Sequence, residues 1–221
     1  GERTEMLADV ELSRLAQAGY AVLLCETGEL DVGQHLRALA DRQIDGVIVA
    51  GISEEELANA DIGRLNVVLV NQTSAAFSAV QDDSLSAGGL AAEHLLGLGH
   101  RAIAFIGPAS AASTFRLRER GFAKALRDAG IAPASEHWMR AEPTVSGGLA
   151  AMRALLALPV RPTAVFCAND LIALGAHKAC ALGGVAIPGG MSILGCDDID
   201  IGTLVTPELS TSGGTSDARF I

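Results

Sequence analysis

The sequence predicts an α/β fold with two lobes, each built on a doubly wound parallel sheet covered by helices. Three observations carry this prediction. Short apolar runs alternate with longer amphipathic stretches along the 221 residues. The runs are apolar throughout, which is typical of strands buried on both faces. Hydrophobic residues make up 49% of the chain and charged residues 19%, so there are enough apolar side chains to form a core.

Each apolar run is predicted to be a strand, and each amphipathic stretch a helix. The strands, in chain order, are Tyr20–Cys25, Gly46–Ala50, Val67–Val70, Ala102–Gly107, Thr163–Ala168 and Met191–Cys196. The helices are Leu7–Ala18, Asp31–Arg42, a segment from Ser53, Ser84–Leu98, Thr114–Ala129, Ser146–Leu158 and Asp170–Leu182. Glycine directly follows several of these helices, as is common at a helix C-terminus. Alternation of this kind forms right-handed crossovers and therefore parallel sheets.

The same pattern divides the chain into lobes. We expect an N-terminal lobe over residues 1–83, and the remainder with the C-terminal lobe over residues 84–211, part of 84–107 returning to the first lobe. Residues 212–221 form an atypical tail, and the polar, glycine-containing segment from Ser210 onward has no strand or helix signal. The chain opens inside a helical pattern, whereas an α/β domain normally begins with a strand. Both ends are therefore predicted to be truncated.

Composition excludes several classes of partner. The formal charge is −10 and the isoelectric point about 4.9, which argues against a chain that binds nucleic acid or an anionic membrane by itself. No apolar run reaches the roughly 18 residues of a membrane span. Residues 1–9 lack the basic start and apolar stretch of a signal peptide. Four scattered cysteines are typical of reduced thiols, so we predict a cytoplasmic protein.

Enzyme motifs are absent from the sequence. It contains no phosphate-binding G-x-x-x-x-G-K-[ST] loop, no G-x-G-x-x-G after a strand and no G-x-S-x-G elbow. The five histidines lack zinc-site spacing. Cys167 is close to Asp170, although a nucleophilic thiolate needs an electropositive setting. We therefore predict a protein that is not an enzyme and that uses no cofactor and no metal.

Polar residues follow three of the predicted strands, and a fourth polar pair comes shortly after Val80, which we also interpret as a strand end. They are Asn71 and Gln72, Asp82 and Asp83, Asn169 and Asp170, and Asp197 and Asp198. Ligands collect at the carboxyl ends of parallel strands, so these side chains could line one cleft that suits a polyhydroxylated ligand. The alternative interpretation is that Asp83, Asp170 and Asp198 are helix N-caps. Both interpretations stay open at this level.

Three arginines lie in the helix that follows the strand Ala102–Gly107. Arg116, Arg118 and Arg120 alternate along the chain, and alternate residues do not share a helix face. One of them can therefore point inward while the others meet solvent or Glu119. An inward arginine would bind ligand hydroxyls or carboxylates with its planar fork.

Several segments, in the same order, resemble the effector-binding core of LacI/GalR-type transcriptional regulators. They are Gln81–His100, Arg101–Gly107, Arg118–Leu126 with its R-x-x-G-F pattern, Pro162–Ala176 with ANDLIALGA, Met191–Ile199 with its Asp-Asp pair, and Pro207–Thr211. The resemblance covers roughly residues 7–211. It implies a type I periplasmic-binding-protein-like fold, in which two α/β lobes close on a small ligand.

The resemblance also implies a site and partners. The family's ligand contacts fall on Arg118, Asn169 and Asp197, and Asp82, Asp83 and Ser86 are further candidates near the hinge. The effector would be a sugar, a sugar phosphate or a nucleobase, with a sugar-like ligand favoured. Pro143 and Cys196 stand where many members have an aromatic residue, so stacking on a ligand ring is expected to be weak.

The resemblance implies an allosteric homodimer. The family binds operator DNA through an N-terminal helix-turn-helix, which is absent from this sequence, so DNA binding is expected only in a full-length regulator. Two other interpretations remain open. One is a solute-binding protein for transport, and the other is a truncated, non-functional fragment of such a regulator.

Overall fold

The computed structural model describes residues 16–23, 25, 32–42, 44–50, 57, 65–71, 74–109, 113–132 and 134–212. The chain forms two compact units, Gly1–Val68 and Leu69–Ile221. The expected lobe boundary after residue 83 stays a prediction.

Among the described residues before position 81, a helix and a small sheet have bounds that can be given. The helix is α2 (Val32–Ala40), and the three-stranded sheet has the order β1 (Gly46–Ala50), β2 (Asn66–Val70), β3 (Ser78–Val80). These elements confirm the helix predicted from Asp31 and two of the predicted strands. The predicted helix over residues 7–18 and the segment from Ser53 lie mostly outside the described residues.

The prediction of a strand over Tyr20–Cys25 is wrong for those of its residues that the structure describes. Residues 20–23 and 25 are not in a strand, and Tyr20 and Leu23 are more than half exposed. An apolar run becomes a strand only when a neighbouring strand pairs with its backbone. The three-stranded sheet ends at β1 and does not include this segment.

A five-stranded parallel sheet forms the centre of the second unit. Its order is β5 (Trp138–Arg140), β4 (Ile103–Gly107), β6 (Ala164–Cys167), β7 (Ser192–Cys196), β8 (Ser210–Ser212). Phe105 pairs in register with Trp138 on one side and Phe166 on the other. The three central strands confirm the prediction. The short edge strands β5 and β8 were missed, and β8 contradicts the prediction of no strand from Ser210 onward.

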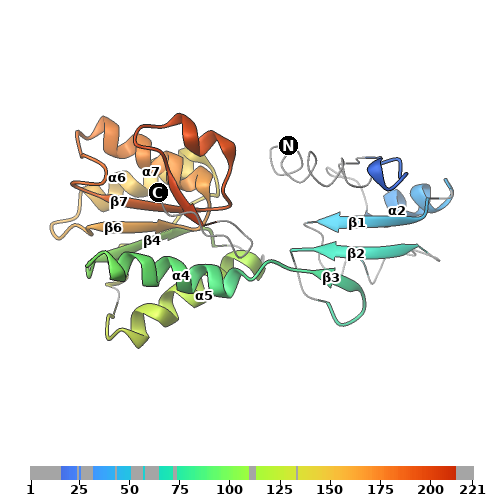
Figure 1. The fold of residues 1–221 in the computed structure, drawn as a ribbon, viewed down its shortest axis with the longest axis horizontal. Helices are drawn as coiled ribbons and strands as arrows, with labels where there is room; N and C mark the ends of the chain where they lie inside the picture. Colours follow the sequence, from blue (N-terminus) through green and yellow to red (C-terminus); the bar gives the residue numbers. More distant parts are fainter. Residues whose placement is uncertain are drawn as a thin grey trace. The chain divides into compact units, whose positions relative to one another are not determined.

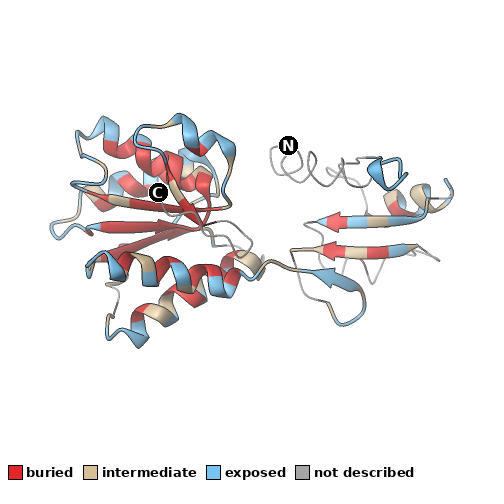
Figure 2. Ribbon diagram, viewed as in Figure 1, coloured by how far each residue is buried: buried red, intermediate tan, exposed pale blue. Residues whose placement is uncertain are grey.

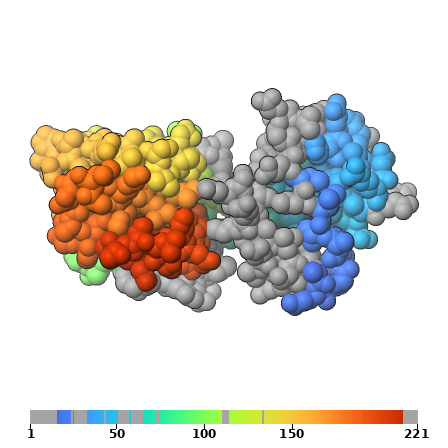
Figure 3. All heavy atoms as spheres, turned by 90° about the horizontal axis from the view of Figure 1, so that it is seen from above, coloured from blue at the N-terminus to red at the C-terminus, as the bar shows by residue number. Residues whose placement is uncertain are grey.

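Four helices cover the two faces of this sheet. Figure 1 shows α4 (Ser84–Gly97) and α5 (Ser113–Asp128) on one face, and α6 (Val145–Leu156) and α7 (Asp170–Leu182) on the other. Seen from the side of α6 and α7, these helices and the segment after β7 form the outer surface (Figure 3). All four confirm predicted helices. Two 3-10 turns, η1 (Ser135–His137) and η2 (Asp200–Leu204), complete the connections.

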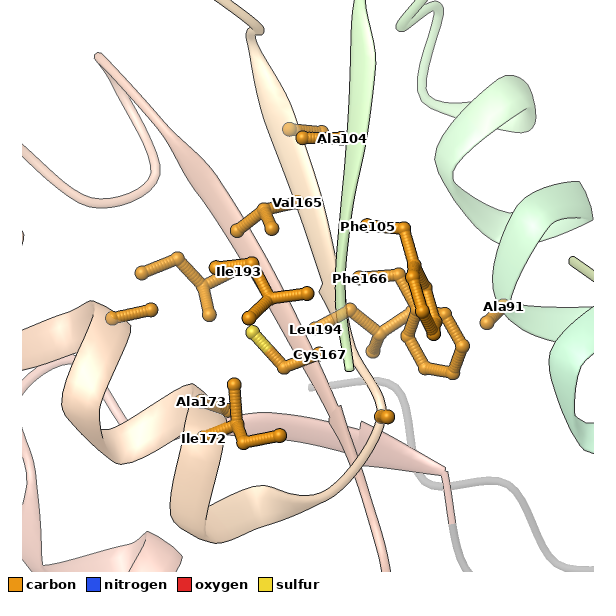
Figure 4. Close-up of a cluster of buried hydrophobic side chains, with 14 of the residues drawn as sticks. Ala91, Ala104, Phe105, Val165, Phe166, Cys167, Ile172, Ala173, Ile193 and Leu194 are labelled. Atoms are coloured by element: carbon orange, nitrogen blue, oxygen red, sulfur yellow. The ribbon is translucent and has the colours of Figure 1, made fainter. Parts of the chain in front are cut away.

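The core lies on both sides of the sheet. The central strands and the inner faces of the helices are buried (Figure 2). On the α4–α5 side, the rings of Phe105, Phe122 and Phe166 pack with centroids 4.9–5.9 Å apart. On the other side, Cys167 lies on the face of the sheet that also carries Ile193 and faces Ile172 and Ala173 of α7 (Figure 4). Burial on both faces explains why these strands are continuously apolar in the sequence.

Glycines let α4 and α5 approach to backbone contact. A Cβ atom at Gly88 would lie 1.9 Å from the carbonyl oxygen of Arg118. A Cβ at Gly121, the glycine of the R-x-x-G-F pattern, would lie 2.0 Å from the carbonyl oxygen of Leu85. Neither position can hold a side chain without moving a helix. The spacing between these helices, and hence the position of Arg118, depends on both glycines.

A histidine joins three strands at the end of the sheet opposite to their carboxyl ends. His100 Nδ1 is 2.8 Å from Thr163 Oγ1, and Nε2 is 3.0 Å from Ser192 Oγ. Because the Thr163 hydroxyl donates to the carbonyl oxygen of Ala102, it accepts from Nδ1–H. Nε2 then accepts from the Ser192 hydroxyl. This tautomer needs a neutral ring, and burial lowers the pKa of His100 accordingly.

Candidate functional site

The strand order of the second unit reverses between β4 and β6. From β4 the chain crosses outward to β5, then returns to the other side of β4 as β6 and continues outward to β7 and β8. In open α/β sheets, ligands bind at the carboxyl ends of the strands where the order reverses. The groups at this position are α5, which follows β4, and the residues that follow β6; the carboxyl end of β7, the next strand, adjoins them. The fold therefore places Arg118, Asn169 and Asp197 where a ligand site is expected.

Arg118 is the inward-facing arginine of α5. It is 4% exposed, whereas Arg116 and Arg120 are exposed, which confirms that one of the three points inward. Its NH1 group donates to the carbonyl oxygen of Ala168, directly after β6, and lies 3.2 Å from Asp197 Oδ1. The guanidinium carbon also lies 6.0 Å from the centre of the Phe115 ring. Arg118 therefore connects the ends of β6 and β7 from the side of α5.

One donor of this arginine has no partner in the described part of the chain. Arg118 Nε is fully buried and makes no hydrogen bond. Leaving a buried donor unsatisfied costs about 1–3 kcal/mol. An unsatisfied buried donor in a native structure indicates either stored strain or a position where another group, such as a ligand, binds.

Asn169 has a structural role as well as its place at the site. It is the N-cap of α7, and its Oδ1 accepts a hydrogen bond of 3.0 Å from the backbone N–H of Ile172. The side chain is 3% exposed. Capping uses the oxygen and leaves the amide Nδ2 as the group that can donate to a ligand.

The alternative interpretation as helix N-caps is wrong for two of the three aspartates, Asp170 and Asp198. Asn169 caps α7 in place of Asp170, and Ile199 precedes η2 in place of Asp198. Asp170 begins the helix with its side chain buried, where it accepts from distant groups instead of from the first turn. Asp83 does cap α4, as predicted.

The loop that carries Asp197 has an unusual backbone. Asp197 has φ +132° and Asp198 has φ +55°, both in the region that favours glycine. The N–H of Asp197 donates to the carbonyl oxygen of Ser212 in β8 over 3.0 Å, and the N–H of Asp198 reaches Thr211 Oγ1 at 3.3 Å. Backbone conformations of this kind cost about 1–3 kcal/mol each and cluster at functional sites. β8, which sequence patterning did not predict, therefore supports the Asp197 loop.

The remaining candidates lie at the start of α4. Asp83 Oδ1 accepts a hydrogen bond of 3.0 Å from the backbone N–H of Ser86, and the bonds from Ser86 hold the pKa of Asp83 below its usual value. The backbone carbonyl oxygen of Asp82 accepts a hydrogen bond from the backbone N–H of Ser84. The structure gives these residues a part in starting the helix. A part in ligand binding remains a prediction for Asp82, Asp83 and Ser86.

Two polar networks of the second unit were not predicted from the sequence. One is the buried carboxylate of Asp170 with its partner Thr211. The other is a network in which Glu119 accepts from Trp138 Nε1 at 2.6 Å and from both terminal nitrogens of Arg140 at 2.7 Å. A signal existed for the first of these. Asp170 is the only acidic residue between positions 143 and 196, and a lone carboxylate in an apolar stretch indicates a buried partner.

The thiols near the strand ends lack the low pKa that is typical of a nucleophilic cysteine. Burial raises the pKa of Cys167 well above its usual value, and the negative charge of Asp170 adds to the effect. Burial also raises the pKa of Cys196 to about 11. Within the described ranges there is no group of three metal-binding side chains, and none of the helices there is long and apolar enough to cross a bilayer.

The two-unit α/β architecture and a polar cluster at the switch point define a ligand-binding domain of the periplasmic-binding-protein type. Comparison with known proteins supports this class directly. The family described as "Periplasmic binding protein-like domain" matches residues 92–212, more than half of the chain.

The similar proteins are transcriptional regulators. The ribose operon repressor of Escherichia coli K12 is 31% identical over 215 residues, which cover 94% of this chain and 65% of that protein. A repressor named PurR from Mannheimia succiniciproducens is 33% identical over 201 residues, covering 87% and 60%. A LacI family regulator from Enterococcus faecium, solved with bound ribose, superposes with a TM-score of 0.76 at 28% identity, covering 89% of this chain and 74% of that one.

The chain therefore belongs to the periplasmic binding protein-like domain family and matches the effector-binding part of LacI/GalR-type regulators. The expected fold and family are confirmed. The chain spans less than two thirds of the length of the curated relatives described above, which are named as repressors and not as enzymes.

Proposed function

We propose that this chain is the effector-sensing domain of a LacI-type transcriptional regulator and that its ligand is a small polyhydroxylated molecule, with the pentose ribose as the leading candidate. The observation that carries the proposal is the ion pair between buried Arg118 and partly exposed Asp197, close to buried Asn169 at the carboxyl ends of β6 and β7. A relative named for the ribose operon and a ribose-bound neighbour support the choice of sugar.

The three side chains divide the recognition between them. Asp197 is 30% exposed, so its carboxylate is accessible and accepts from ligand hydroxyls. Asn169 donates through Nδ2 because its oxygen is occupied by the helix cap. Arg118 donates to ligand oxygens from a guanidinium whose Nε has no partner among the described residues. Donors and acceptors together suit a sugar, whose hydroxyls both donate and accept.

Binding alone would not regulate transcription. The effector must bind one arrangement of the two lobes more tightly than the other, because a ligand with equal affinity for both shifts nothing. In a full-length, cytoplasmic homodimer, this difference would change how the DNA-binding parts reach the operator. The domain itself performs no chemistry in this proposal, and sugar phosphates and nucleobases are the competing effectors.

The first experiment is calorimetric titration and thermal unfolding with D-ribose, ribose 5-phosphate and adenine. At one hundred times its Kd a ligand adds about 2.7 kcal/mol to the free energy of unfolding. We expect D-ribose to raise the melting temperature and the other two to have little effect.

Matched variants locate the site. Arg118→Met and Asp197→Ala should weaken D-ribose binding at least tenfold, whereas Arg116→Met, on the exposed face of the same helix, should bind as the wild type does. Unchanged affinity in Arg118→Met would contradict the proposed site. A melting temperature that none of the three compounds moves would contradict the proposed ligand class.

A further inference from the structure

Asp170 is a buried carboxylate that joins three elements of the second unit. It lies in the first turn of α7 and is 1% exposed. Its Oδ1 accepts a hydrogen bond of 2.6 Å from the Thr211 hydroxyl in β8, and its Oδ2 accepts one of 3.0 Å from the backbone N–H of Ile199. Both oxygens are thus used by groups distant in the sequence, and neither caps its own helix.

The groups bound by Asp170 flank the loop that presents Asp197. Ile199 lies two residues after Asp197, and Thr211 Oγ1 also accepts from the N–H of Asp198 at 3.3 Å. The loop itself is strained, since Asp197 and Asp198 both have positive φ values. A strained loop persists only where its surroundings hold it. One carboxylate holds this loop directly at Ile199 and indirectly through Thr211.

The surroundings leave this carboxylate little freedom. A Cβ atom at Gly195, in β7, would lie 2.0 Å from Asp170 Oδ1. Glycine at this position therefore makes room for the carboxylate against the strand. Burial raises the pKa of Asp170, while the bonds from Thr211 and Ile199 lower it. These two bonds compensate part of the cost of burying the charge.

We propose that Asp170 is a positioning residue of the effector site: it holds the Asp197–Ile199 loop so that the Asp197 carboxylate faces Arg118, without touching the ligand itself. The part of this inference that concerns affinity rests on the proposed function. The part that concerns the loop does not, and it can be measured without any ligand. The same carboxylate ties the loop to β8, so the two elements should loosen together.

The test compares Asp170→Asn with the wild type by amide hydrogen exchange and D-ribose titration. In the asparagine variant one of the two carboxylate oxygens becomes an NH2 donor. If the remaining oxygen keeps the bond from the Ile199 N–H, the amide nitrogen faces Thr211 Oγ1, and the hydroxyl hydrogen of Thr211 loses the acceptor it has in the wild type. We expect exchange at Asp198 and Ile199 to become at least tenfold faster while Ala173, inside α7, keeps its protection relative to global unfolding. D-ribose affinity should fall at least tenfold.

Two further changes keep the inference testable if Asp170→Asn does not fold. Gly195→Ala displaces the carboxylate without removing its charge and should reproduce the fast loop exchange. Thr211→Val removes one hydrogen bond and should act in the same direction, whereas Thr211→Ser retains the hydroxyl and should behave as the wild type.

The outcomes separate the two proposals. Wild-type exchange rates at Asp198 and Ile199 in these variants, or unchanged D-ribose affinity in Asp170→Asn, would overturn the positioning role. Faster loop exchange in a protein whose wild type does not bind D-ribose would support the positioning role and contradict the proposed ligand.

Discussion

The close contact between α4 and α5 allows a sharp test with two neighbouring glycines. In Gly88→Ala the new methyl group would lie 1.9 Å from the carbonyl oxygen of Arg118 and 2.9 Å from the backbone nitrogen of Phe122. Ordinary carbon–oxygen contacts begin at about 3.3 Å, so the helices must separate locally by roughly 1 Å. Overpacking of this kind costs about 1–3 kcal/mol. Because the obstructing atoms are backbone, no side-chain rotation can relieve it.

Gly89→Ala is the matched control on the same helix. A Cβ atom there has nothing within 4 Å, among the contacts of the described residues. Replacing glycine by alanine inside a helix stabilises by about 0.5–1 kcal/mol. The same glycine-to-alanine change at adjacent positions should therefore have opposite effects on the free energy of unfolding.

Thermal unfolding measures the difference. For a chain of this size, 1 kcal/mol corresponds to about 2–4 °C. We expect Gly88→Ala to lower the melting temperature by about 2–12 °C, and Gly89→Ala to raise it by about 1–4 °C. Gly88→Ala should also weaken ligand binding, since it displaces the turn of α5 that carries Arg118. Equal melting temperatures for the two variants would refute the packing argument.

Three further predictions follow from the site and the sheet. Asp197→Asn leaves the guanidinium of Arg118 without its carboxylate partner. Breaking a fully buried ion pair costs about 3–5 kcal/mol. Because Asp197 is partly exposed, we expect the free energy of unfolding, measured with denaturant, to fall by about 1–3 kcal/mol. Burial lowers the pKa of His100 below its usual 6.5, so the stability it contributes is full above about pH 6.5 and is lost as the pH falls. His100→Gln should flatten the pH dependence of the melting temperature in that range. With the thiol pKa of Cys196 raised to about 11, iodoacetamide at pH 8 should modify exposed Cys25 in the native state and reach Cys196 only after unfolding.

Much of the second unit could be predicted from the sequence. The helices α4 to α7 and the strands β4, β6 and β7 correspond to predicted elements, because strands buried on both faces leave a continuous apolar run and helices leave a periodic one. The edge strands β5 and β8 have only three residues each. Such short strands are formed by pairing with a neighbour, and their own composition carries no signal.

The structure brings together three residues that the sequence singled out, while their part in ligand binding stays a prediction. Asn169 and Asp197 follow adjoining strands, and Arg118 of α5 pairs with Asp197. The capping assignments of Asp170 and Asp198 were wrong. An N-cap and a buried acceptor both require a short polar residue at the start of a helix, so sequence spacing does not distinguish them.

The sequence by itself predicted helices α4 to α7 and strands β4, β6 and β7 in the right order, an inward position for one of three arginines, and the family. These properties depend on neighbours along the chain, or on motifs that are read in order. Only the tertiary structure decided that Asn169 caps α7 and that Asp170 binds Thr211. The Asp170–Thr211 hydrogen bond joins residues 41 positions apart. Its existence depends on parallel strands bringing their carboxyl ends to one edge of the sheet, where chain distance no longer limits which groups meet.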